Sequence, residues 1–215
     1  MKRKCLGILQ VVLIAVTIFS GAIAIAILFR PFYHWHILPL DLPERVGLTP
    51  AQIKTAYKEM MNYCTGLSDT FSVGILPFSE SGAAHFADVR RLFLLDLGAF
   101  FLCGGLLVIL SVLTRKSRIL MGKHTPGFWA SIGLGVTFLA VGILAALDFD
   151  RAFTVFHKLF FPGKDNWIFY PTKDPVIRIL PAEFFRNCAI LILLCIFISC
   201  AALLLWDRYK RTRLR

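Results

Sequence analysis

Residues 148–185 read DFDRAFTVFHKLFFPGKDNWIFYPTKDPVIRILPAEFF and separate two long apolar runs. The segment carries charges and prolines, and its aromatic residues are dense around His157. This composition is too polar to lie in lipid and too rich in aromatic rings for a passive linker. We interpret the segment as one wall of an active site at a membrane surface, with a second wall supplied by the residues around His85.

The rest of the composition is that of an integral membrane protein. Of the 215 residues 57% are hydrophobic, and a mean hydropathy of +0.70 excludes an ordinary soluble domain. Four apolar runs cover residues 6–29, 92–113, 128–147 and 189–206. Asp96 is the only charged residue in them. A helix rises about 1.5 Å per residue, so each run can cross a hydrocarbon core of roughly 30 Å. Since none alternates like a membrane barrel strand, we predict four transmembrane helices.

A cleaved signal peptide is the alternative interpretation of the first run. Ala22 and Ala24 fit a small-x-small cleavage site after a basic start. The apolar run continues to Phe29, however, and is longer than the core of a signal peptide needs to be. We therefore favour a transmembrane helix.

The basic residues predict the orientation of the chain. They concentrate before the first run, between the second and third, and after the fourth: Lys2, Arg3, Lys4, Arg115, Lys116, Arg118, Lys123, Arg208, Lys210, Arg211, Arg213 and Arg215. The two long connections mix basic with nearly equal numbers of acidic residues. The positive-inside rule then places both termini in the cytoplasm and both long connections outside. This bias accounts for the net charge of +11, so nucleic acid need not be invoked.

The predicted fold class is an all-α membrane protein with an extracellular cap built from the two outer connections. Its order is a first transmembrane helix with a cytoplasmic N-terminus (1–29), a first cap segment (30–91), a second transmembrane helix (92–113), a cytoplasmic loop (114–127), a third transmembrane helix (128–147), a second cap segment (148–186), a fourth transmembrane helix (187–206) and a basic cytoplasmic tail (207–215).

The first cap segment contains recognisable local patterns. Thr49 and Pro50 start a helix, Gly66 ends it, and apolar residues recur at three- and four-residue steps between them. We expect this amphipathic helix to lie on the membrane or against the second cap segment. Alternating apolar residues in 69–81 predict a short strand or an extended arm. Ser79 or Ser81 then caps a helix that continues into the second span.

The familiar motifs of hydrolases and nucleotide-binding proteins are absent. There is no G-x-S-x-G, no GxxxxGK[ST], no H-E-x-x-H, no C-x-x-C and no dinucleotide-binding fingerprint. His34 and His36 form an H-x-H pair without a third ligand at usable spacing, so we assign them a structural role and predict no metal site. Neither a nucleotide nor another cofactor is expected. His124 in the basic loop is expected to be solvated, and Asp96 to make a structural ion pair or hydrogen bond.

Two histidines remain as candidates for chemistry, His85 in the first cap segment and His157 in the second. Imidazole takes or gives a proton near neutral pH, and two imidazoles allow one base and one acid in the same turnover. The alternative for each is a partly buried polar residue that is hydrogen-bonded within an aromatic cap. Placement of both on one side of the membrane favours the chemical interpretation.

The sequence resembles the lipoprotein intramolecular transacylase (Lit) family of small four-span proteins from Gram-positive bacteria. The residues that carry the resemblance are SESGAAHFADVRRLF (79–93) with His85, DFDRAFTVFHKLFF (148–161) with His157, WIFYPTKDP (167–175) and LPAEFF (180–185). The resemblance covers essentially the whole chain. It is an associational argument, separate from the physical one above.

The resemblance implies an acyl transfer within one lipid-anchored substrate in the bacterial cell membrane. The sn-2 acyl chain of an S-diacylglyceryl lipoprotein moves from its glyceryl ester to the α-amine of the N-terminal cysteine, which leaves the lyso-form. Ester to amide is downhill, so no ATP or coenzyme is required. The implied partners are this lipoprotein and the bilayer, and the implied site lies on the extracellular side.

The residue roles then follow as hypotheses. His85 and His157 are the acid–base pair, in an order that the sequence leaves open. Asp88 and Asp150 are candidates for orienting an imidazole, and Arg90, Asn166 and Trp167 for donating to the oxyanion. The substrate-binding wall is assigned to Phe153, Phe160, Phe161, Trp167, Phe169 and Tyr170, for which simple packing is the alternative.

Two other classes of protein stay open from the sequence. A non-enzymatic four-span adaptor would tolerate the loss of both histidines. A bis-histidine haem bundle would absorb strongly in the visible range, but its ligands usually lie within spans, and neither His85 nor His157 does.

Overall fold

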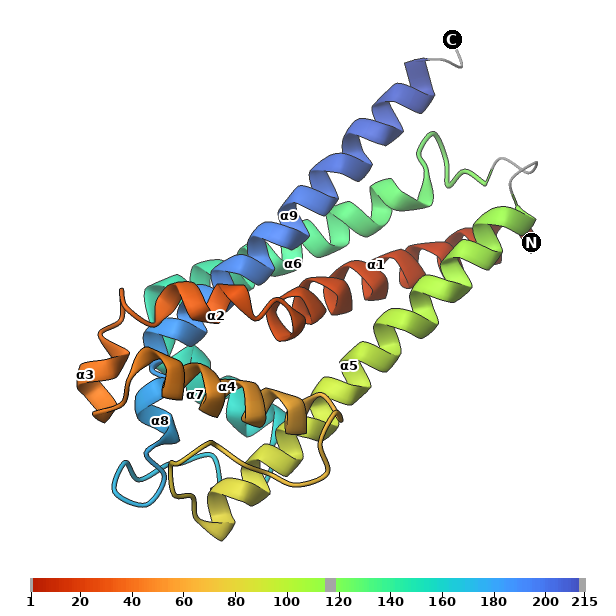
Figure 1. Ribbon diagram of the computed structural model, residues 1–215. Helices are drawn as coiled ribbons and strands as arrows, with labels where there is room; N and C mark the ends of the chain where they lie inside the picture. The colour runs from red at the N-terminus through yellow and green to blue at the C-terminus, as the bar shows by residue number, and fades with distance from the viewer. Residues whose placement is uncertain (1, 115–118, 213–215) are drawn as a thin grey trace. The chain divides into compact units, whose positions relative to one another are not determined.

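The computed structural model describes residues 2–114 and 119–212, which form the helices labelled in Figure 1. They are α1 (Lys2–Leu28), α2 (Pro31–His36), α3 (Leu42–Val46), α4 (Pro50–Cys64), α5 (Glu80–Leu113), α6 (Pro126–Leu147), α7 (Phe149–Phe160), α8 (Val176–Ile179) and α9 (Ala182–Thr212). The all-α fold class is confirmed. Among the basic residues used for the orientation, Arg115, Lys116, Arg118, Arg213 and Arg215 lie outside the described residues.

The chain divides into two compact units. The first, here called the membrane unit, comprises Met1–Ile25, Asp96–Leu144 and Leu191–Arg215, and the second, here called the cap unit, comprises Ala26–Leu95 and Ala145–Ile190. Both candidate histidines belong to the cap unit.

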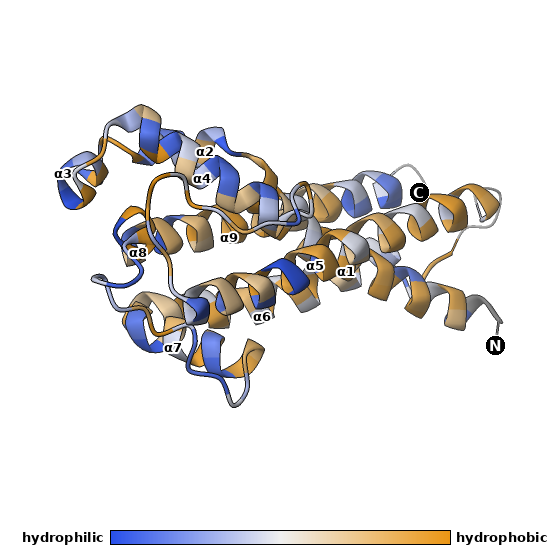
Figure 2. Cartoon of the chain, turned by 60° about the horizontal axis from the view of Figure 1, so that its bottom comes forward, coloured by the Kyte–Doolittle hydropathy of each residue, from blue (hydrophilic) through white to orange (hydrophobic). Residues whose placement is uncertain are grey.

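Within residues 2–114 and 119–212, four helices are long and apolar enough to cross a membrane, namely α1, α5, α6 and α9. Figure 2 shows their hydrophobic colouring. The 34 residues of α5 would extend about 51 Å, well beyond a hydrocarbon core of about 30 Å. Its most apolar window contains no buried residue, whereas His85, Phe86 and Asp88 near its start are buried. The part of α5 before Leu92 therefore lies outside the predicted span.

The membrane unit is held together by small and aliphatic side chains. Ala22, Leu134, Ile196 and Cys200 form its buried cluster. Cys200 thus packs as a small apolar residue. The charge in the second run, Asp96, takes a hydrogen bond from Ser20 of α1, which is one of the two expected structural roles.

The loop before α6 departs from expectation at His124, which is not simply solvated. Its Nδ1 lies 2.9 Å from Asp207 Oδ2, and its ring stacks on Phe128 with centroids 3.7 Å apart. The fully buried Asp207 carboxylate also accepts from the Thr125 backbone N–H at 2.7 Å and pairs with Arg211 at 3.1 Å. The loop is therefore fastened to α9, which remains helical through Thr212. Sequence position could not reveal a pair of residues so far apart in the chain.

Helix α4 has the predicted start. Thr49 and Gln52 form a reciprocal capping box, and Pro50 opens the helix. Its apolar stripe is buried inside the protein: Ile53, Tyr57, Met60, Met61 and Cys64. The Tyr57 ring stacks 3.7 Å from Tyr33 and lies edge-on to Phe184 of the second cap segment. Of the two expected positions, the one against the second cap segment is therefore correct.

The segment between α4 and α5 contains no strand in the part of the chain that the structure describes. Instead Glu59 of α4 accepts hydrogen bonds from Ser72 Oγ at 2.6 Å and from the Gly74 backbone N–H at 2.9 Å. A carboxylate thus takes the place of a partner strand for these donors. Of the two predicted alternatives, the short strand does not form among the described residues; the segment is irregular and turns at Gly74, where the Leu76 N–H donates to the Val73 carbonyl at 3.2 Å.

Candidate functional site

His85 is positioned by the capped start of α5. Ser79 is the capping residue, since its Oγ accepts from the Gly82 backbone N–H at 3.0 Å. Asp174 from the second cap segment accepts from both Ser79 N–H, at 2.7 Å, and Ser79 Oγ–H, at 2.8 Å. Gly82 is needed here because a Cβ at this position would meet the Asp174 carboxylate and the Phe169 ring. Asp174 therefore ties the two cap segments together one turn from His85.

Sequence reasoning missed Asp174, which is only 4% exposed. Replacing Asp174 with alanine leaves Ser79 N–H and Oγ–H without their buried acceptor. We expect a loss of about 1–3 kcal/mol in the free energy of unfolding. Thermal unfolding of the purified protein in detergent measures this loss. Asp165→Ala is the matched control because Asp165 is exposed, and equal melting temperatures for the two variants would contradict the prediction.

His157 is positioned by α7. Asp148 caps this helix by accepting from the Arg151 backbone N–H at 2.9 Å. The helix ends before Pro162 and Gly163, whose φ of 72° suits glycine. Within it, only His157, in the third turn, is buried, at 7% exposure.

The structure brings the two imidazoles together. Their ring centroids lie 5.9 Å apart with an interplanar angle of 31°. His85 comes from the first cap segment and His157 from the second, as predicted, and both side chains are buried. A single small reacting group placed beside them can contact both rings.

Aromatic side chains surround the pair. The Phe161 centroid lies 5.0 Å from His85 and 5.7 Å from His157. Phe169 lies 5.4 Å from His85, while Phe153 and Trp167 lie 4.2 Å and 4.8 Å from His157. We call Phe153, Phe161, Trp167 and Phe169 the aromatic cage.

Two predicted wall residues do not belong to the aromatic cage. Phe160 is 45% exposed and its ring contacts Phe156, and Tyr170 is 63% exposed. The sequence pattern could not separate inward from outward rings in so aromatic a segment. Phe86 was missed, and it lies beside both His85 and Phe169.

The two imidazoles differ in their hydrogen bonds. His157 Nδ1 lies 2.8 Å from the Phe153 carbonyl oxygen, which can only accept, so Nδ1 carries the proton. In neutral His157 the lone pair is therefore on Nε2. His85 Nδ1 is buried and has no hydrogen-bond partner within the described residues. A buried polar atom without a partner is costly and often marks a functional group.

Burial keeps both imidazoles neutral. The pKa of His85 is lowered to about 4, first by burial and second by the neighbouring His157, with Asp88 and Asn166 opposing the shift. Burial also lowers the pKa of His157, and the hydrogen bond to the Phe153 carbonyl opposes it. Both rings are therefore proton acceptors at neutral pH.

Asp88 forms a polar cluster beside His85 instead of orienting an imidazole directly. Its carboxylate accepts from Lys164 Nζ at 2.6 Å and from Asn166 Nδ2 at 3.1 Å. Burial alone would raise the pKa of Asp88, but the hydrogen bonds from Lys164 and Asn166 bring it below its ordinary value. Asp88 is thus an anion that fixes the Asn166 side chain.

Asn166 presents an acceptor to the site. Its Nδ2 donates one hydrogen bond to the Asp88 carboxylate, and its buried Oδ1 has no hydrogen-bond partner within the described residues. Asn166 lies close enough to His85 to favour the protonated ring, yet neither Asn166 Oδ1 nor His85 Nδ1 has a partner with hydrogen-bonding geometry. With Nδ2 held by the Asp88 carboxylate, the unpartnered Oδ1 is an acceptor, which suits a hydrogen-bond donor and not an oxyanion.

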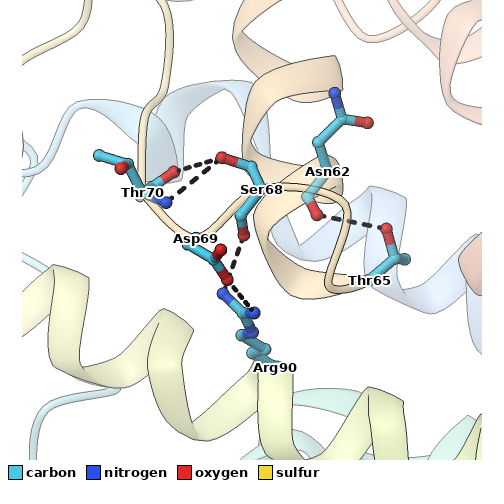
Figure 3. A network of polar contacts seen from close by, with 6 residues as sticks. All are labelled: Asn62, Thr65, Ser68, Asp69, Thr70 and Arg90. Carbon is cyan, nitrogen blue, oxygen red and sulfur yellow. Dashed lines mark hydrogen bonds and ion pairs between the residues drawn. The ribbon is translucent and has the colours of Figure 1, made fainter.

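The remaining predicted residues lie elsewhere. Arg90 donates to the Ser68 carbonyl at 2.8 Å and to Asp69 at 3.0 Å (Figure 3). Its guanidinium also lies over the Tyr63 ring. It secures the loop after α4 and is not available to an oxyanion. Asp150 is exposed in the first turn of α7, whereas His157 is buried. Trp167 directs its Nε1–H to the Lys164 carbonyl at 2.9 Å, so it too is engaged.

The described residues contain no group of three or more His, Cys, Asp or Glu side chains that could hold a metal ion. His36 Nδ1 lies 2.6 Å from the Phe32 carbonyl oxygen, in keeping with a structural role. The chemistry available in the cap unit is thus that of two neutral imidazoles, an amide oxygen and an enclosing set of rings.

Comparisons with known proteins give a consistent result. The family model for lipoprotein intramolecular transacylase Lit matches residues 8–185. The in meso structure of the membrane integral lipoprotein intramolecular transacylase Lit from Bacillus cereus is similar with a TM-score of 0.91 and 27% identity, over 100% of this chain and 99% of that chain. Structures of the Bacillus cereus protein with an H85R mutation and with an H85A mutation, both 27% identical, give TM-scores of 0.82 and 0.81. They cover 99% and 100% of this chain and 94% and 96% of those chains. No curated protein matches the chain.

The family match extends through both cap segments and reaches Phe185, so it includes both histidines. An adaptor without chemistry is therefore the wrong alternative. The chain belongs to the Lit family of lipoprotein intramolecular transacylases and is a membrane-integral acyltransferase.

Proposed function

We propose that this acyltransferase moves the sn-2 acyl chain of an S-diacylglyceryl lipoprotein to the α-amine of its N-terminal cysteine, with His85 and His157 as the acid–base pair. The observation that carries the proposal is the pair itself, two buried imidazoles 5.9 Å apart from separate segments. The balance of the reaction is simple. A nitrogen–carbon bond forms, a carbon–oxygen bond breaks, and one proton passes from the amine to the glyceryl oxygen.

His157 is assigned as the base. Its Nδ1–H is held by the Phe153 carbonyl, which leaves Nε2 free to accept the proton of the attacking amine. The accepted proton must end on the glyceryl oxygen, and His85 lies beside His157 to hold or hand on that proton. Because each charged ring disfavours charge on the other, the pair carries one proton at a time.

Asn166 Oδ1 is assigned to the substrate α-amine. The amine is the one hydrogen-bond donor of the reacting centre, whereas the ester and its oxyanion only accept. An acceptor fixed by Asp88 next to His85 complements that donor. This role replaces the oxyanion role that the sequence suggested.

The aromatic cage contributes by confining the substrate. Intramolecular attack passes through a medium-sized ring, which a free chain rarely adopts. Rings on several sides of the imidazoles hold amine and ester together and exclude water that would hydrolyse the ester.

The positive-inside pattern supports an extracellular site. Basic residues lie before the first run, between the second and third runs, and after the fourth. We therefore assign both termini to the cytoplasm and the cap unit to the outer surface of the cell membrane. The proposal includes the predicted boundaries of the spans and of the cap segments.

Mass spectrometry of a lipoprotein N-terminal peptide tests the proposed reaction. The chain is expressed in a host that lacks such an activity. An unchanged total acyl mass together with a newly acylated α-amine is the expected result. A free α-amine, or loss of one acyl chain by hydrolysis, would refute the proposal.

The rate should rise with pH between about 5 and about 8.5. The α-amine has a pKa near 8 and attacks only when neutral, and each histidine must be neutral to accept a proton. Since the histidine pKa values lie below the ordinary value, the amine limits the rate above about pH 6.5 and the histidines limit it only in more acid solution. Single-turnover rates of the detergent-solubilised enzyme against pH measure this profile. His34→Gln, which removes an imidazole outside the aromatic cage, should leave it unchanged, and a rate that falls from pH 6 to pH 8 would contradict it.

A further inference from the structure

Helix α7 has an apolar face that no described residue covers. Val155, Phe156, Leu159 and Phe160 are 56%, 47%, 70% and 45% exposed. Their spacing of one and four residues places them on one side of the helix. Figure 2 shows both hydrophobic and hydrophilic colouring along α7.

The other sides of α7 have different surroundings. Phe153 and His157 point inward, and His157 is buried beside His85. The polar side carries Asp150, Arg151 and Lys158, all exposed. The helix thus has a catalytic side, a polar side and an uncovered apolar side.

Helix α4 belongs to the same cap unit as α7, but its apolar stripe is not exposed. The apolar stripe of α4 is buried against protein, with Ile53 fully buried and Tyr57 only 4% exposed. The α7 stripe is as apolar but has no such cover. An exposed apolar face of this kind marks an interaction surface.

Three observations favour lipid as the occupant. Leu147, the last residue of α6, is 79% exposed, so the apolar surface of a candidate span continues to the start of α7 two residues later. Arg151 and Lys158 on the neighbouring side are placed to reach lipid phosphates while their stems cover apolar surface. Ile168 and Tyr170, which follow in the same segment, are 48% and 63% exposed, as is typical of residues at a membrane boundary.

We propose that the Val155–Phe156–Leu159–Phe160 face of α7 lies in the boundary of the bilayer, in contact with phospholipid acyl chains. Phe156 of this face lies with its ring 5.4 Å from the His157 ring, so the face adjoins the imidazole pair. A lipid-anchored substrate can therefore approach the imidazoles from within the leaflet. This inference concerns where α7 lies, and it does not depend on which residue carries out the acyl transfer.

Site-specific photocrosslinking tests the contact without using activity. The chain carrying Leu159→p-benzoylphenylalanine is reconstituted in phosphatidylethanolamine–phosphatidylglycerol vesicles, irradiated and analysed by intact-mass spectrometry. We expect a phospholipid adduct several-fold more abundant than with Lys158→p-benzoylphenylalanine. Lys158 is the matched control because it is the preceding residue, is exposed, and projects from the polar side.

A second pair of positions repeats the comparison in case one variant of the first pair misfolds. Phe156 on the apolar face and Asp150 on the polar side receive the same photoreactive residue, and each variant is first checked for unchanged thermal unfolding. Equal lipid labelling on the two sides would overturn the proposal. A crosslink from the apolar face to a second copy of the chain would also overturn it, because the face would then be a protein interface.

Discussion

Replacing His157 with asparagine is expected to lower the rate of acyl transfer by about 10²–10⁴-fold, the usual contribution of a positioned general base. Asparagine is chosen because its Nδ2–H can keep the hydrogen bond to the Phe153 carbonyl, while the Nε2 lone pair of the imidazole is lost. The substitution therefore separates the proton-accepting role from the structural one. Acylation of the lipoprotein α-amine, measured by mass spectrometry, reports the rate.

His85→Ala should cause a loss of similar size. The double variant should lose little more than either single variant, because residues that share one proton act as a unit. His36→Asn is the control, since its Nδ1 also contacts a backbone carbonyl but its ring lies outside the aromatic cage. Full activity in the double variant would exclude histidine catalysis.

Asn166→Ala is expected to weaken the binding of the free-amine substrate by about 10–100-fold, in line with the loss of a hydrogen-bond acceptor in a buried site. An oxyanion donor would behave differently, lowering kcat by about 10²–10³-fold with little change in KM. The split between KM and kcat therefore decides between the two roles.

Lys164→Met is the matched control for Asn166→Ala. It removes the other main partner of the Asp88 carboxylate but leaves the hydrogen bond from Asn166 Nδ2 in place. We expect a smaller effect on substrate binding than that of Asn166→Ala. A larger effect would indicate that the charge of the cluster, and not the Asn166 oxygen, governs binding.

The helices of the chain could be predicted well from local patterns. The apolar runs and the Thr49–Pro50 start of α4 act within one or two turns, so their physical causes are visible in the sequence. The choice of His85 and His157 as a pair rested on the expectation that both cap segments lie on one side of the membrane and on the resemblance to the Lit family. The structure brings these two rings together.

The neighbours of the two histidines could not be predicted in the same way. Arg90 and Tyr170 seemed suited to a site by residue type, but Arg90 is engaged by Ser68 and Asp69, and Tyr170 is exposed. Asp174, in contrast, looked like an ordinary loop residue, yet its buried carboxylate joins the two cap segments. Long-range hydrogen bonds leave no periodic signal in the sequence.

Local patterns thus identify a membrane protein with four candidate spans and two polar connections, each of which carries one candidate catalytic histidine, because hydropathy and helix starts are local properties. Only the tertiary structure decided which rings face the imidazoles, which nitrogen of His157 carries the proton, and which atom of Asn166 is free. Those properties depend on partners from distant parts of the chain, such as the Asp88 carboxylate that orients the Asn166 amide.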